Sequence, residues 1–476
     1  MKLDKLTHIY FLGIGGIGMS ALARFFLASG KSVSGYDKTA TELTSELIKE
    51  GIEIHFEESV AAIPEAVKNA AIEYVLVVWT PAVPVDHAEL NWLKRNGFTI
   101  MKRAQVLGLI VGQTKTIAVA GTHGKSTTTT LTAHILRTAG IDCSAFLGGI
   151  SRNYNTNLLL GKNLGDANVS AEDKIVVAEA DEYDRSFLWL HPSIAIVTSV
   201  DADHLDIYGS ESAMKDTYRD FLKQVKERLI TKDVVLKSLD LAKDGRVVSY
   251  SVDDKSCDAF AENIRIEEGF YVFDLVIQDS KISNVRMGLP GRHNVENAVA
   301  AAAAAKQIGV DDESIREALS SFKGVKRRFD YRIRDSKLIF IDDYGHHPAE
   351  LKACISSVKE LFPGKKVTGI FQPHLFSRTR DFADEFARSL ELLDEVVLLE
   401  IYPAREKPIP GISSTMLLEK INRQRKFLYS KEDLVSKIAS HDFDVLIAMG
   451  AGDIDQLVEP IENALREKFK IKEVVS

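Results

Sequence analysis

The sequence predicts an α/β fold of three domains, the first and last of them Rossmann-like. Short β-rich runs alternate with helical runs along almost the whole chain, which is typical of βαβ units around a parallel sheet. One glycine-rich turn follows a β-rich run near the N-terminus, and a second follows another such run near residue 121. The length of 476 residues also exceeds what one ordinary hydrophobic core holds together. We expect domains over residues 1–112, 113–326 and 327–476.

The composition is that of an ordinary globular protein, and it bears on which partners and which cellular compartment we expect. Hydrophobic residues make up 45% and charged residues 27%, and the formal net charge is −8. Because an acidic chain is a poor general surface for nucleic acid, bound anions would need local basic sites. The three cysteines, Cys143, Cys257 and Cys354, are far apart and suit a reducing compartment. With no secretory signal and no apolar stretch of membrane-spanning length, we expect a cytoplasmic protein without membrane or nucleic-acid partners.

The first element is a strand over 8–12, followed by a glycine turn, a helix and a second strand that ends at Asp37. Gly13, Gly15 and Gly18 fit the pattern G-x-G-x-x-G. Asp37 is near the spacing at which an acid meets a ribose in dinucleotide-binding folds. These residues alone leave two interpretations open, a nicotinamide enzyme or a site for another diphosphate. Further β-rich runs over 74–84 and 98–102 continue the parallel sheet.

The second segment opens with a strand over 116–120 and a phosphate-binding turn. Gly121, Gly124, Lys125 and Ser126 stand between this strand and a helix, where backbone N–H groups point toward an anion. Lys125 would reach the β- and γ-phosphates, and the Ser126 hydroxyl would bind Mg²⁺. The motif is shorter than the standard one, because Val119 stands where another glycine is usual. The strand before it and the helix after it favour a nucleoside triphosphate site.

Acidic residues follow two strands of this segment. Glu179, Asp181 and Glu182 stand at the carboxyl end of the β-rich run 174–180, and Asp201, Asp203 and His204 come after the run 193–200. Open α/β sheets bind ligands at the carboxyl ends of their strands. Because Mg²⁺ prefers oxygen ligands, Glu179 is the better candidate and His204 the weaker one. The two loops beside one phosphate-binding turn predict a metal–triphosphate site.

The rest of the chain predicts an antiparallel excursion over 264–287, a close-packed alanine-rich helix after 292, and a third α/β domain. The basic stretch 323–332 marks the boundary before that domain. Beyond it, β-rich runs within 337–345, 366–374, 395–403 and 444–452 alternate with helices.

Nine short motifs now stand in an order that resembles the Mur ligase family. They read GIGGIGM, AGTHGKST, EADE-D-SF, ADH-D-Y, GRHN-EN, RRFD, DDYGHHP, FQPH-F-RTRD and YPA-E-PIPG. They cover nearly the whole chain and are most similar to the branch that joins L-alanine to UDP-N-acetylmuramate. The resemblance implies a UDP-sugar-binding domain, a central P-loop ATPase domain and a C-terminal substrate-binding domain that closes over both.

The resemblance also implies site residues in the first two domains. The UDP-sugar would bind Gly15, Gly16, Ile17, Gly18, Asp37, Thr80, Pro81 and Arg103. ATP would bind Gly121, Thr122, His123, Gly124, Lys125, Ser126, Thr127, His293, Asn294 and Asn297. The metal ligands would be Ser126, Glu179 and His204. Asparagine suits an adenine edge because its amide both donates and accepts hydrogen bonds.

Further site residues are implied at the start of the third domain and within it. The amino-acid substrate would meet Tyr344, His346, Arg378 and Arg380. The catalytic set would be Lys125, His204, Arg327, Arg328, Asp343, His346, His374 and Arg380. At least one of the two arginines at the boundary would reach the γ-phosphate, where positive charge stabilises phosphoryl transfer. The base for the attacking amine stays open between His346 and Asp343.

The activity implied is an ATP-dependent ligation of L-alanine to the lactyl carboxylate of UDP-N-acetylmuramate, in peptidoglycan precursor synthesis. It would pass through an acyl phosphate, with ATP and Mg²⁺ as cofactors and Mn²⁺ as an alternative ion, in a monomer or homodimer. One alternative is a recycling ligase that adds a murein tripeptide to the same UDP-sugar. Another is a regulator that binds ATP and senses a UDP-sugar. A dehydrogenase is disfavoured because a P-loop domain has no role in hydride transfer.

Two positions depart from the family pattern. Ser199 stands where members usually have asparagine, and Leu375 stands where they often have arginine. The second departure removes a positive charge suited to a carboxylate.

Overall fold

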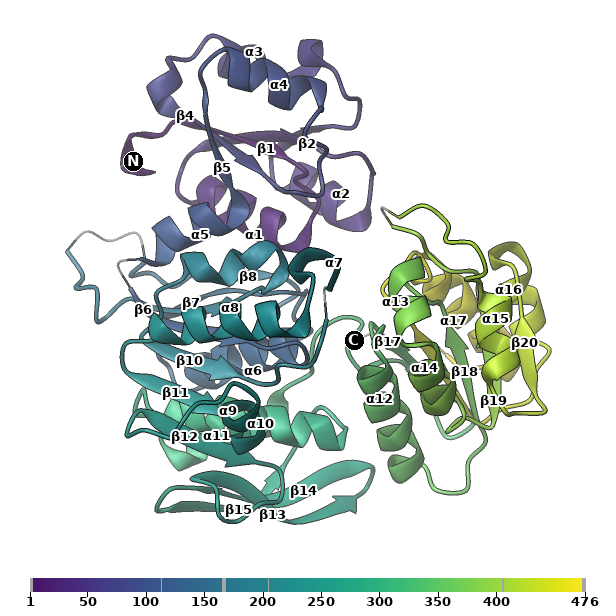
Figure 1. Ribbon diagram of the computed structural model, residues 1–476. Coiled ribbons are helices and arrows are strands. Elements are labelled where there is room, and N and C mark those ends of the chain that lie inside the picture. The colour runs from purple at the N-terminus through teal and green to yellow at the C-terminus, as the bar shows by residue number, and fades with distance from the viewer. Residues whose placement is uncertain (1–2, 113, 165–167, 204, 405, 473–476) are drawn as a thin grey trace. The chain divides into compact units, whose positions relative to one another are not determined.

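A computed structural model of the chain describes residues 3–112, 114–164, 168–203, 205–404 and 406–472. Within these residues lie three sheets, of five, ten and six strands in chain order, with helices between the strands (Figure 1). This confirms the predicted three-part α/β fold. The chain divides into two compact units, of which one is Met1–Glu262, Leu275–Ser283 and Asn297–Ser321. The other is Asn263–Asp274, Asn284–Glu296 and Phe322–Ser476. The domain boundaries after residues 112 and 326 stay a prediction.

The N-terminal sheet is parallel, with strand order β3-β2-β1-β4-β5. Its strands are β1 (His8–Leu12), β2 (Ser32–Tyr36), β3 (Glu53–His55), β4 (Val75–Trp79) and β5 (Thr99–Lys102). Its helices are α1 (Ile17–Ala28), α2 (Glu42–Lys49), α3 (Glu65–Lys68), α4 (Ala88–Arg95) and α5 (Arg103–Val111). The order reverses on either side of β1, and ligands bind at the carboxyl ends of strands at such a point.

Alternate residues of β1 enter two separate cores. Tyr10 and Leu12 belong to the core under α3 and α4, whereas Ile9 and Phe11 belong to the core that contains α1 and α5 (Figure 1). Both faces of the strand are therefore buried, which explains its continuous apolar sequence. β4 ends earlier than the run 74–84 predicted, because Val83 N–H donates to Thr80 O and closes a turn.

The central sheet is mixed, and β6 lies between β10 and β9 with all three strands parallel. Its strands are β6 (Lys115–Ala120), β7 (Cys143–Phe146), β8 (Leu158–Leu159), β9 (Ile175–Glu179), β10 (Ile194–Val197), β11 (Arg228–Thr231), β12 (Val247–Ser251), β13 (Ala259–Glu267), β14 (Phe270–Ile277) and β15 (Ser280–Arg286). The strands β13, β14 and β15 are joined by two-residue turns, which only antiparallel strands allow, as the excursion near 264–287 predicted.

Helices surround this sheet. They are α6 (Lys125–Thr138), the 3₁₀ segment η4 (Tyr183–Trp189), α7 (Leu205–Tyr208), α8 (Glu211–Lys223), α9 (Asp233–Ser238), α10 (Arg292–Lys306) and α11 (Asp312–Ser321). The alanine run Ala300–Ala305 of α10 has no exposed surface, which confirms close packing. Threonines of α6 remain compatible with a buried helix because Thr129, Thr130 and Thr132 donate to carbonyls four residues earlier.

The N-terminal and central sheets share one hydrophobic core. Its members include Phe11 and Phe26 from the first sheet region and Ala118 and Val176 from the second. The ring centroids of Phe25 on α1 and Phe146 on β7 lie 5.8 Å apart. α1 is therefore packed directly on the central sheet.

The C-terminal sheet has the order β16-β17-β21-β18-β19-β20 and a core of its own. Its strands are β16 (Asp330–Arg334), β17 (Ile339–Asp343), β18 (Val367–Phe371), β19 (Glu395–Leu398), β20 (Lys426–Leu428) and β21 (Val445–Met449). Its helices are α12 (Pro348–Leu361), α13 (Phe376–Asp381), α14 (Ala383–Leu390), α15 (Ser414–Lys420), α16 (Lys431–Ile438) and α17 (Asp455–Phe469). Only β16 is antiparallel to its neighbour among these described strands.

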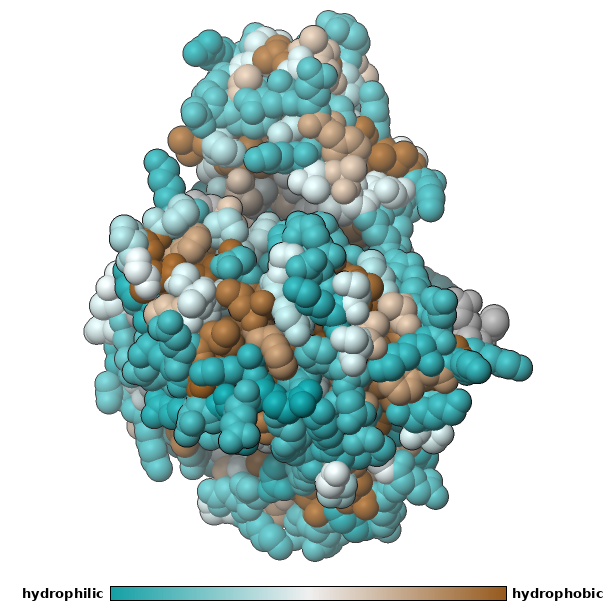
Figure 2. Space-filling model, turned by 90° about the vertical axis from the view of Figure 1, so that its right-hand side faces the viewer, coloured by the Kyte–Doolittle hydropathy of each residue, from teal (hydrophilic) through white to brown (hydrophobic). Residues whose placement is uncertain are grey.

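The face drawn in Figure 2 carries mostly hydrophilic side chains, with the hydrophobic ones in separate patches. Among the described helices, none combines the length and apolar character needed to cross a lipid bilayer.

Candidate active site

The glycine turn between β1 and α1 packs against the loop that follows β4, and the first turn of α1 packs against the start of α5. Gly13 has φ of +87°, and a Cβ there would lie 2.5 Å from Thr80 Cγ2. A Cβ at Gly18 would lie 2.7 Å from Arg103 Nη1. Glycine therefore lets the start of α1 come close to Thr80 and Arg103. Three of the predicted UDP-sugar residues are brought together here.

Asp37 holds the glycine turn in place. Its Oδ2 accepts a hydrogen bond of 2.7 Å from Gly15 N–H, and its Oδ1 accepts one of 3.1 Å from Thr39 N–H. The family resemblance implies that Asp37 binds the UDP-sugar, and in the structure its carboxylate also accepts these two backbone hydrogen bonds.

A cavity of about 220 Å³ lies between the start of α1 and the central sheet. One wall is formed by α1 and its turn, and the opposite wall by the loops after β7 and β9. Its lining residues are Gly16, Ile17, Gly18, Met19, Ala21, Leu22, Thr80, Arg103, Leu107, Phe146, Leu147, Gly148, Glu179 and Asp181. Arg103 Nη2 lies 3.3 Å from Asp181 Oδ2, so a positive and a negative side chain meet inside it. Predicted sugar-binding and metal-binding residues thus line one space.

The phosphate-binding turn between β6 and α6 adopts a conformation reserved for glycine. Gly121 has φ of +127° and Gly124 has φ of +79°. A Cβ at Gly121 would lie 2.1 Å from Thr198 Oγ1, and one at Gly124 would lie 2.6 Å from Asn297 Oδ1. Ser126 and Thr127 follow in the first turn of α6, whose initial N–H groups have no acceptor within the helix. This turn fits a phosphate group.

Lys125 is partly buried, with 14% of its side chain exposed, and lies among acidic side chains. Its Nζ donates to Glu182 Oε1 at 2.7 Å and to Gly121 O at 2.6 Å. Burial alone would lower the pKa of Lys125, but the carboxylates of Glu182, Glu179 and Asp181 outweigh it and raise the pKa above its ordinary value. Lys125 is therefore a fixed positive charge at the predicted triphosphate site.

Ser199, the departure from the family pattern, supports the phosphate-binding turn. Its hydroxyl lies 2.8 Å from Thr122 Oγ1 and accepts a hydrogen bond of 3.0 Å from His123 N–H. Asp201 N–H in turn donates to Thr122 Oγ1 at 3.2 Å. The small hydroxyl thus links the loop after β10 to the turn after β6.

The Glu179 carboxylate lies against Gly148 in the loop after β7. A Cβ at Gly148 would lie 1.9 Å from Glu179 Oε2, so a larger residue there would displace the Glu179 carboxylate. The residues that the structure describes hold no group of three or more His, Cys, Asp or Glu side chains arranged as a metal site. His204, a predicted metal ligand and catalytic residue, lies outside the described residues. A metal at Ser126 and Glu179 would therefore take further ligands from phosphate or water, as Mg²⁺ usually does.

The start of α10 supplies the three predicted nucleotide contacts. Asn297 lies against Gly124 of the phosphate-binding turn. Asn294 Nδ2 donates to Pro290 O at 2.6 Å. The ring of His293 lies 6.3 Å from that of Phe329, and burial lowers its pKa to about 4. His293 is thus a neutral, structural neighbour of the boundary segment as well as a predicted ATP contact.

The two boundary arginines surround Tyr344. The guanidinium carbons of Arg327 and Arg328 lie 5.2 Å and 4.7 Å from its ring centroid. Arg327 has φ of +63°, and its Nη2 donates to Gly450 O at 2.7 Å. Arg327 also forms an ion pair with Asp455 at 3.4 Å. The predicted phosphate-binding arginines are therefore held by the C-terminal sheet region.

Two adjacent aspartates end β17, and both are buried. Asp343 accepts hydrogen bonds from Phe329 N–H at 2.7 Å and Gly345 N–H at 2.8 Å. Burial raises the pKa of Asp343, and it raises that of Asp342 to about 7 despite the nearby guanidinium of Arg327. Asp343 thus fixes the backbone around the predicted catalytic loop.

Aromatic and basic side chains gather after β17 and β18. The His346 ring lies 6.0 Å from the His374 ring, and the His374 ring stacks on Tyr402 at 5.7 Å. Arg378 Nη1 lies 3.3 Å from His374 Nδ1, and Tyr344 packs edge-on against His346 at 5.3 Å. Four predicted site residues therefore form one cluster, namely Tyr344, His346, His374 and Arg378. Tyr402 belongs to the same cluster but was not among the predicted site residues.

Two further predicted residues stand apart from these clusters. The side chain of Arg380 is about half exposed and pairs with its neighbour Asp381 at 2.7 Å. Pro81 is exposed and does not line the cavity. Their predicted roles would require substrate to reach them from solvent.

Sequence reasoning missed the contact partners of several site residues. Glu182 appears there as one of three acids at a strand end, but its bond to Lys125 has no local signal because 57 residues separate them. Gly148 belongs to a glycine pair at 148–149, which is the kind of signal that marks close backbone approach.

Comparison with known proteins agrees with this geometry. The chain matches the Mur ligase family catalytic domain over residues 8–115, the Mur ligase middle domain over 119–305 and the Mur ligase glutamate ligase domain over 327–452. It is 48% identical over 472 residues to UDP-N-acetylmuramate–L-alanine ligase of Parabacteroides distasonis, covering 99% of this chain and 100% of that one.

Two solved structures resemble the whole chain. UDP-N-acetylmuramate–alanine ligase from Thermotoga maritima has a TM-score of 0.77 and 28% identity, covering 97% of this chain and 99% of that one. A murein peptide ligase from Psychrobacter arcticus has a TM-score of 0.72 and 26% identity, covering 98% and 100%. On the matching domains and the full-length identity, this chain belongs to the Mur ligase family.

Proposed function

We propose that the chain joins L-alanine to the lactyl carboxylate of UDP-N-acetylmuramate, with ATP converted to ADP and phosphate. The observation that carries this proposal is one cavity lined both by the start of α1 and by Glu179, whose negative charge acts on Lys125 of the phosphate-binding turn. A diphosphate-linked substrate and a metal–triphosphate can meet in such a space. The 48% identity to curated L-alanine ligases supports this pair of substrates.

The UDP-sugar would occupy the α1 side of the cavity. The N-terminus of a helix favours an anion, and the turn from Gly15 to Gly18 leaves room for a diphosphate. Arg103 lies in the same lining and would add positive charge. Thr80 and Pro81 would border the sugar, and Asp37 the uridine.

ATP would bind the turn from Gly121 to Thr127, with Asn294, Asn297 and His293 near the base. The left-handed Gly121 and Gly124 and the positive charge of the partly buried Lys125 fit a triphosphate. Mg²⁺, or Mn²⁺ in its place, fits the oxygen ligands Ser126 and Glu179, with His204 as a further candidate. A bound metal would supply positive charge that offsets the charge of the triphosphate.

The reaction would proceed in two displacements. A lactyl carboxylate oxygen bonds to the γ-phosphorus as the bond to the ADP oxygen breaks, which yields an acyl phosphate. The amine nitrogen of L-alanine then bonds to the acyl carbon, the carbon–oxygen bond to phosphate breaks, and a base takes the amine proton. Lys125 and an arginine of the Arg327–Arg328 pair would stabilise the transferring phosphoryl group.

The cluster of Tyr344, His346, His374 and Arg378 would bind L-alanine. The planar guanidinium of Arg378 would bind the carboxylate of L-alanine. Arg380, which is about half exposed, would add a further positive charge. His346 is the better base, because both oxygens of Asp343 already accept backbone N–H groups. The imidazole Nδ1 of His346 lies 3.2 Å from Tyr344 O and 3.4 Å from Glu350 Oε2, and these contacts orient the ring.

A murein tripeptide is the competing amino substrate. The likeness to the Psychrobacter arcticus murein peptide ligase favours it, but at 26% identity that likeness is weaker than the 48% identity to L-alanine ligases.

The deciding experiment measures phosphate release from ATP and Mg²⁺ with UDP-N-acetylmuramate, adding L-alanine or L-alanyl-γ-D-glutamyl-diaminopimelate in parallel. We expect release that depends on L-alanine and is lost in Lys125→Ala. Lys223→Ala, an exposed lysine on α8 that pairs with Asp220, serves as the matched control and should keep full activity.

Turnover with the tripeptide alone would reassign the amino substrate to the recycling reaction. UDP-sugar binding without turnover on either amine would favour a regulator and contradict the ligase proposal.

A further inference from the structure

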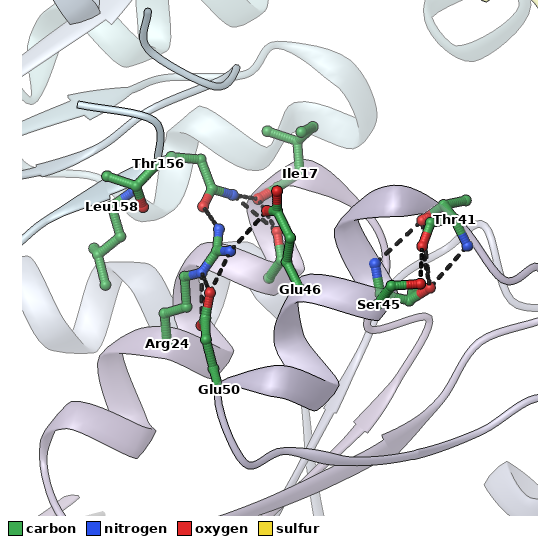
Figure 3. A network of polar contacts seen from close by, with 11 residues as sticks. Ile17, Arg24, Thr41, Ser45, Glu46, Glu50, Thr156 and Leu158 are labelled. Carbon is green, nitrogen blue, oxygen red and sulfur yellow. Dashed lines mark hydrogen bonds and ion pairs between the residues drawn. The ribbon is translucent and has the colours of Figure 1, made fainter. Parts of the chain in front are cut away.

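Arg24 joins α1 to α2 and to the segment between β7 and β8 (Figure 3). Its guanidinium is almost fully buried and forms ion pairs with Glu46 on α2 at 3.3 Å and with Glu50, the residue that caps the end of α2, at 2.6 Å. Its Nη1 donates to Asn157 Oδ1 at 2.5 Å. Burial would lower the pKa of Arg24, but Glu50 and Glu46 raise it, so the guanidinium stays charged. Glu46 and Glu50 neutralise the charge of the Arg24 guanidinium, and its Nη1 is directed at Asn157.

Asn157 uses its whole amide in this contact. It is fully buried, and its Nδ2 donates to Ile17 O at 2.7 Å and to Ser20 Oγ at 2.8 Å. Ile17 and Ser20 lie in the first turn of α1, directly after the glycine turn. An asparagine amide has two donors and an acceptor in one plane, and all three functions are used here.

The backbone of Asn157 holds the opposite wall of the cavity. Leu147 N–H donates to Asn157 O at 2.9 Å, and Leu147 lines the cavity beside Gly148. Asn157 thus bonds to α1 through its side chain and to the loop after β7 through its carbonyl. These are the two walls between which the UDP-sugar and the triphosphate would meet.

α2 completes the support at the other end of the glycine turn. Thr41 and Thr44 form a reciprocal cap at the start of α2 (Figure 3). A Cβ at Gly15 would lie 2.8 Å from Thr44 Cγ2, so this cap touches the turn. α2 is therefore fixed at its last turn by Arg24 and meets the glycine turn at its first.

We propose that Asn157, supported by Arg24, is a positioning residue that sets the start of α1 against the Glu179 side of the cavity. It binds neither substrate itself. This inference rests on the proposed function, since it assigns the α1 side to the diphosphate of the UDP-sugar. Loss of the amide contact lets α1 shift relative to the loop after β7, which weakens UDP-sugar binding and leaves ATP binding at the phosphate-binding turn intact.

The test compares Asn157→Asp with the wild-type chain. Aspartate keeps the shape of the side chain and the acceptor for Arg24, but it removes both donors to Ile17 O and Ser20 Oγ. We expect the Kd for UDP-N-acetylmuramate, measured by calorimetry, to rise about tenfold, the ratio that follows from a lost buried hydrogen bond. The KM for ATP should stay within about twofold, since the turn after β6 is unchanged.

Asn153→Ala is the matched control, because Asn153 lies in the same segment but donates to Ser321 O on α11 at 2.8 Å. Its Kd for the UDP-sugar should equal that of the wild type. Equal Kd values for Asn157→Asp and wild type, or a rise shared by Asn153→Ala, would overturn the positioning role and leave the proposed function standing. A wild-type chain that does not bind UDP-N-acetylmuramate would instead remove the proposed function and this inference with it.

Discussion

The charge of the partly buried Lys125 is balanced by nearby carboxylates. Glu182, its direct partner, has 1% of its side chain exposed, and Glu179 and Asp181 add negative charge nearby. A buried ion pair contributes little by itself, but removal of one partner leaves an uncompensated charge. A triphosphate would therefore compete with Glu182 for the same ammonium group.

We expect Lys125→Met to lose both activity and stability. The free energy of unfolding should fall by about 3 kcal/mol, because Glu182 is left buried without its cation. The double variant Lys125→Met/Glu182→Gln should recover most of that stability in urea unfolding but none of the phosphate release. A double variant as unstable as the single one would show that Glu182 is not the balancing charge.

The raised pKa of Asp342 should make the stability of the protein depend on pH. Burial raises its pKa from the ordinary 3.8 to about 7, so the folded protein holds a proton that the unfolded chain releases between these values. Stability therefore falls as pH rises through this window. Asp342→Asn should remove this fall and be more stable than wild type at pH 8, by on the order of 3 kcal/mol, with little difference at pH 4. Parallel stability curves from urea unfolding at several pH values would contradict the raised pKa.

At the scale of the element, the buried parallel strands were predictable and the edge strand β16 was not. β1, β6, β10 and β21 are continuous apolar runs, and the structure confirms each. β16 is an edge strand that begins within a basic stretch, so its sequence indicated only a boundary. Short-range patterns record burial, but edge pairing depends on a neighbour far along the chain.

In the candidate site too, local motifs were predictable, whereas contacts between distant parts of the chain were not. Motifs in the sequence predicted the two glycine turns and the acid-bearing loops. They could not show that Asp37 bonds to Gly15, that Ser199 bonds to Thr122, or that Glu179 contacts Gly148. These contacts arise because parallel strands bring their carboxyl ends to one edge of a sheet, which local sequence does not record.

The loop after β7 should be sensitive to one methyl group. In Gly148→Ala the new Cβ would overlap Glu179 Oε2, so Glu179 must move away from its predicted metal-binding position. We expect phosphate release to fall at least about tenfold, with a higher Mg²⁺ requirement, if one metal contact weakens by about 1.4 kcal/mol. Gly245→Ala, where a Cβ would meet no atom within 4 Å, is the control and should be fully active. An unchanged Mg²⁺ dependence in Gly148→Ala would argue against Glu179 as a ligand.

At the scale of the whole molecule, the cores indicate how the sheets unfold. The N-terminal and central sheets share one hydrophobic cluster, whereas the C-terminal sheet has a separate one. Residues in one contiguous core tend to open together in native-state hydrogen exchange. The cavity is lined from both of the first two sheets, so its geometry depends on their joint stability.

Phe26→Ala and Ile461→Ala should separate these two cooperative units. Each residue is buried, Phe26 in the shared cluster and Ile461 in the C-terminal one, and each truncation should cost about 3 kcal/mol. In hydrogen exchange followed by mass spectrometry at low urea, Phe26→Ala should accelerate exchange in β1 and in β6 alike and leave β18 unchanged. Ile461→Ala should show the reverse. Faster exchange confined to β1 in Phe26→Ala would mean that the first sheet opens alone, in which case the cavity could lose one wall without global unfolding.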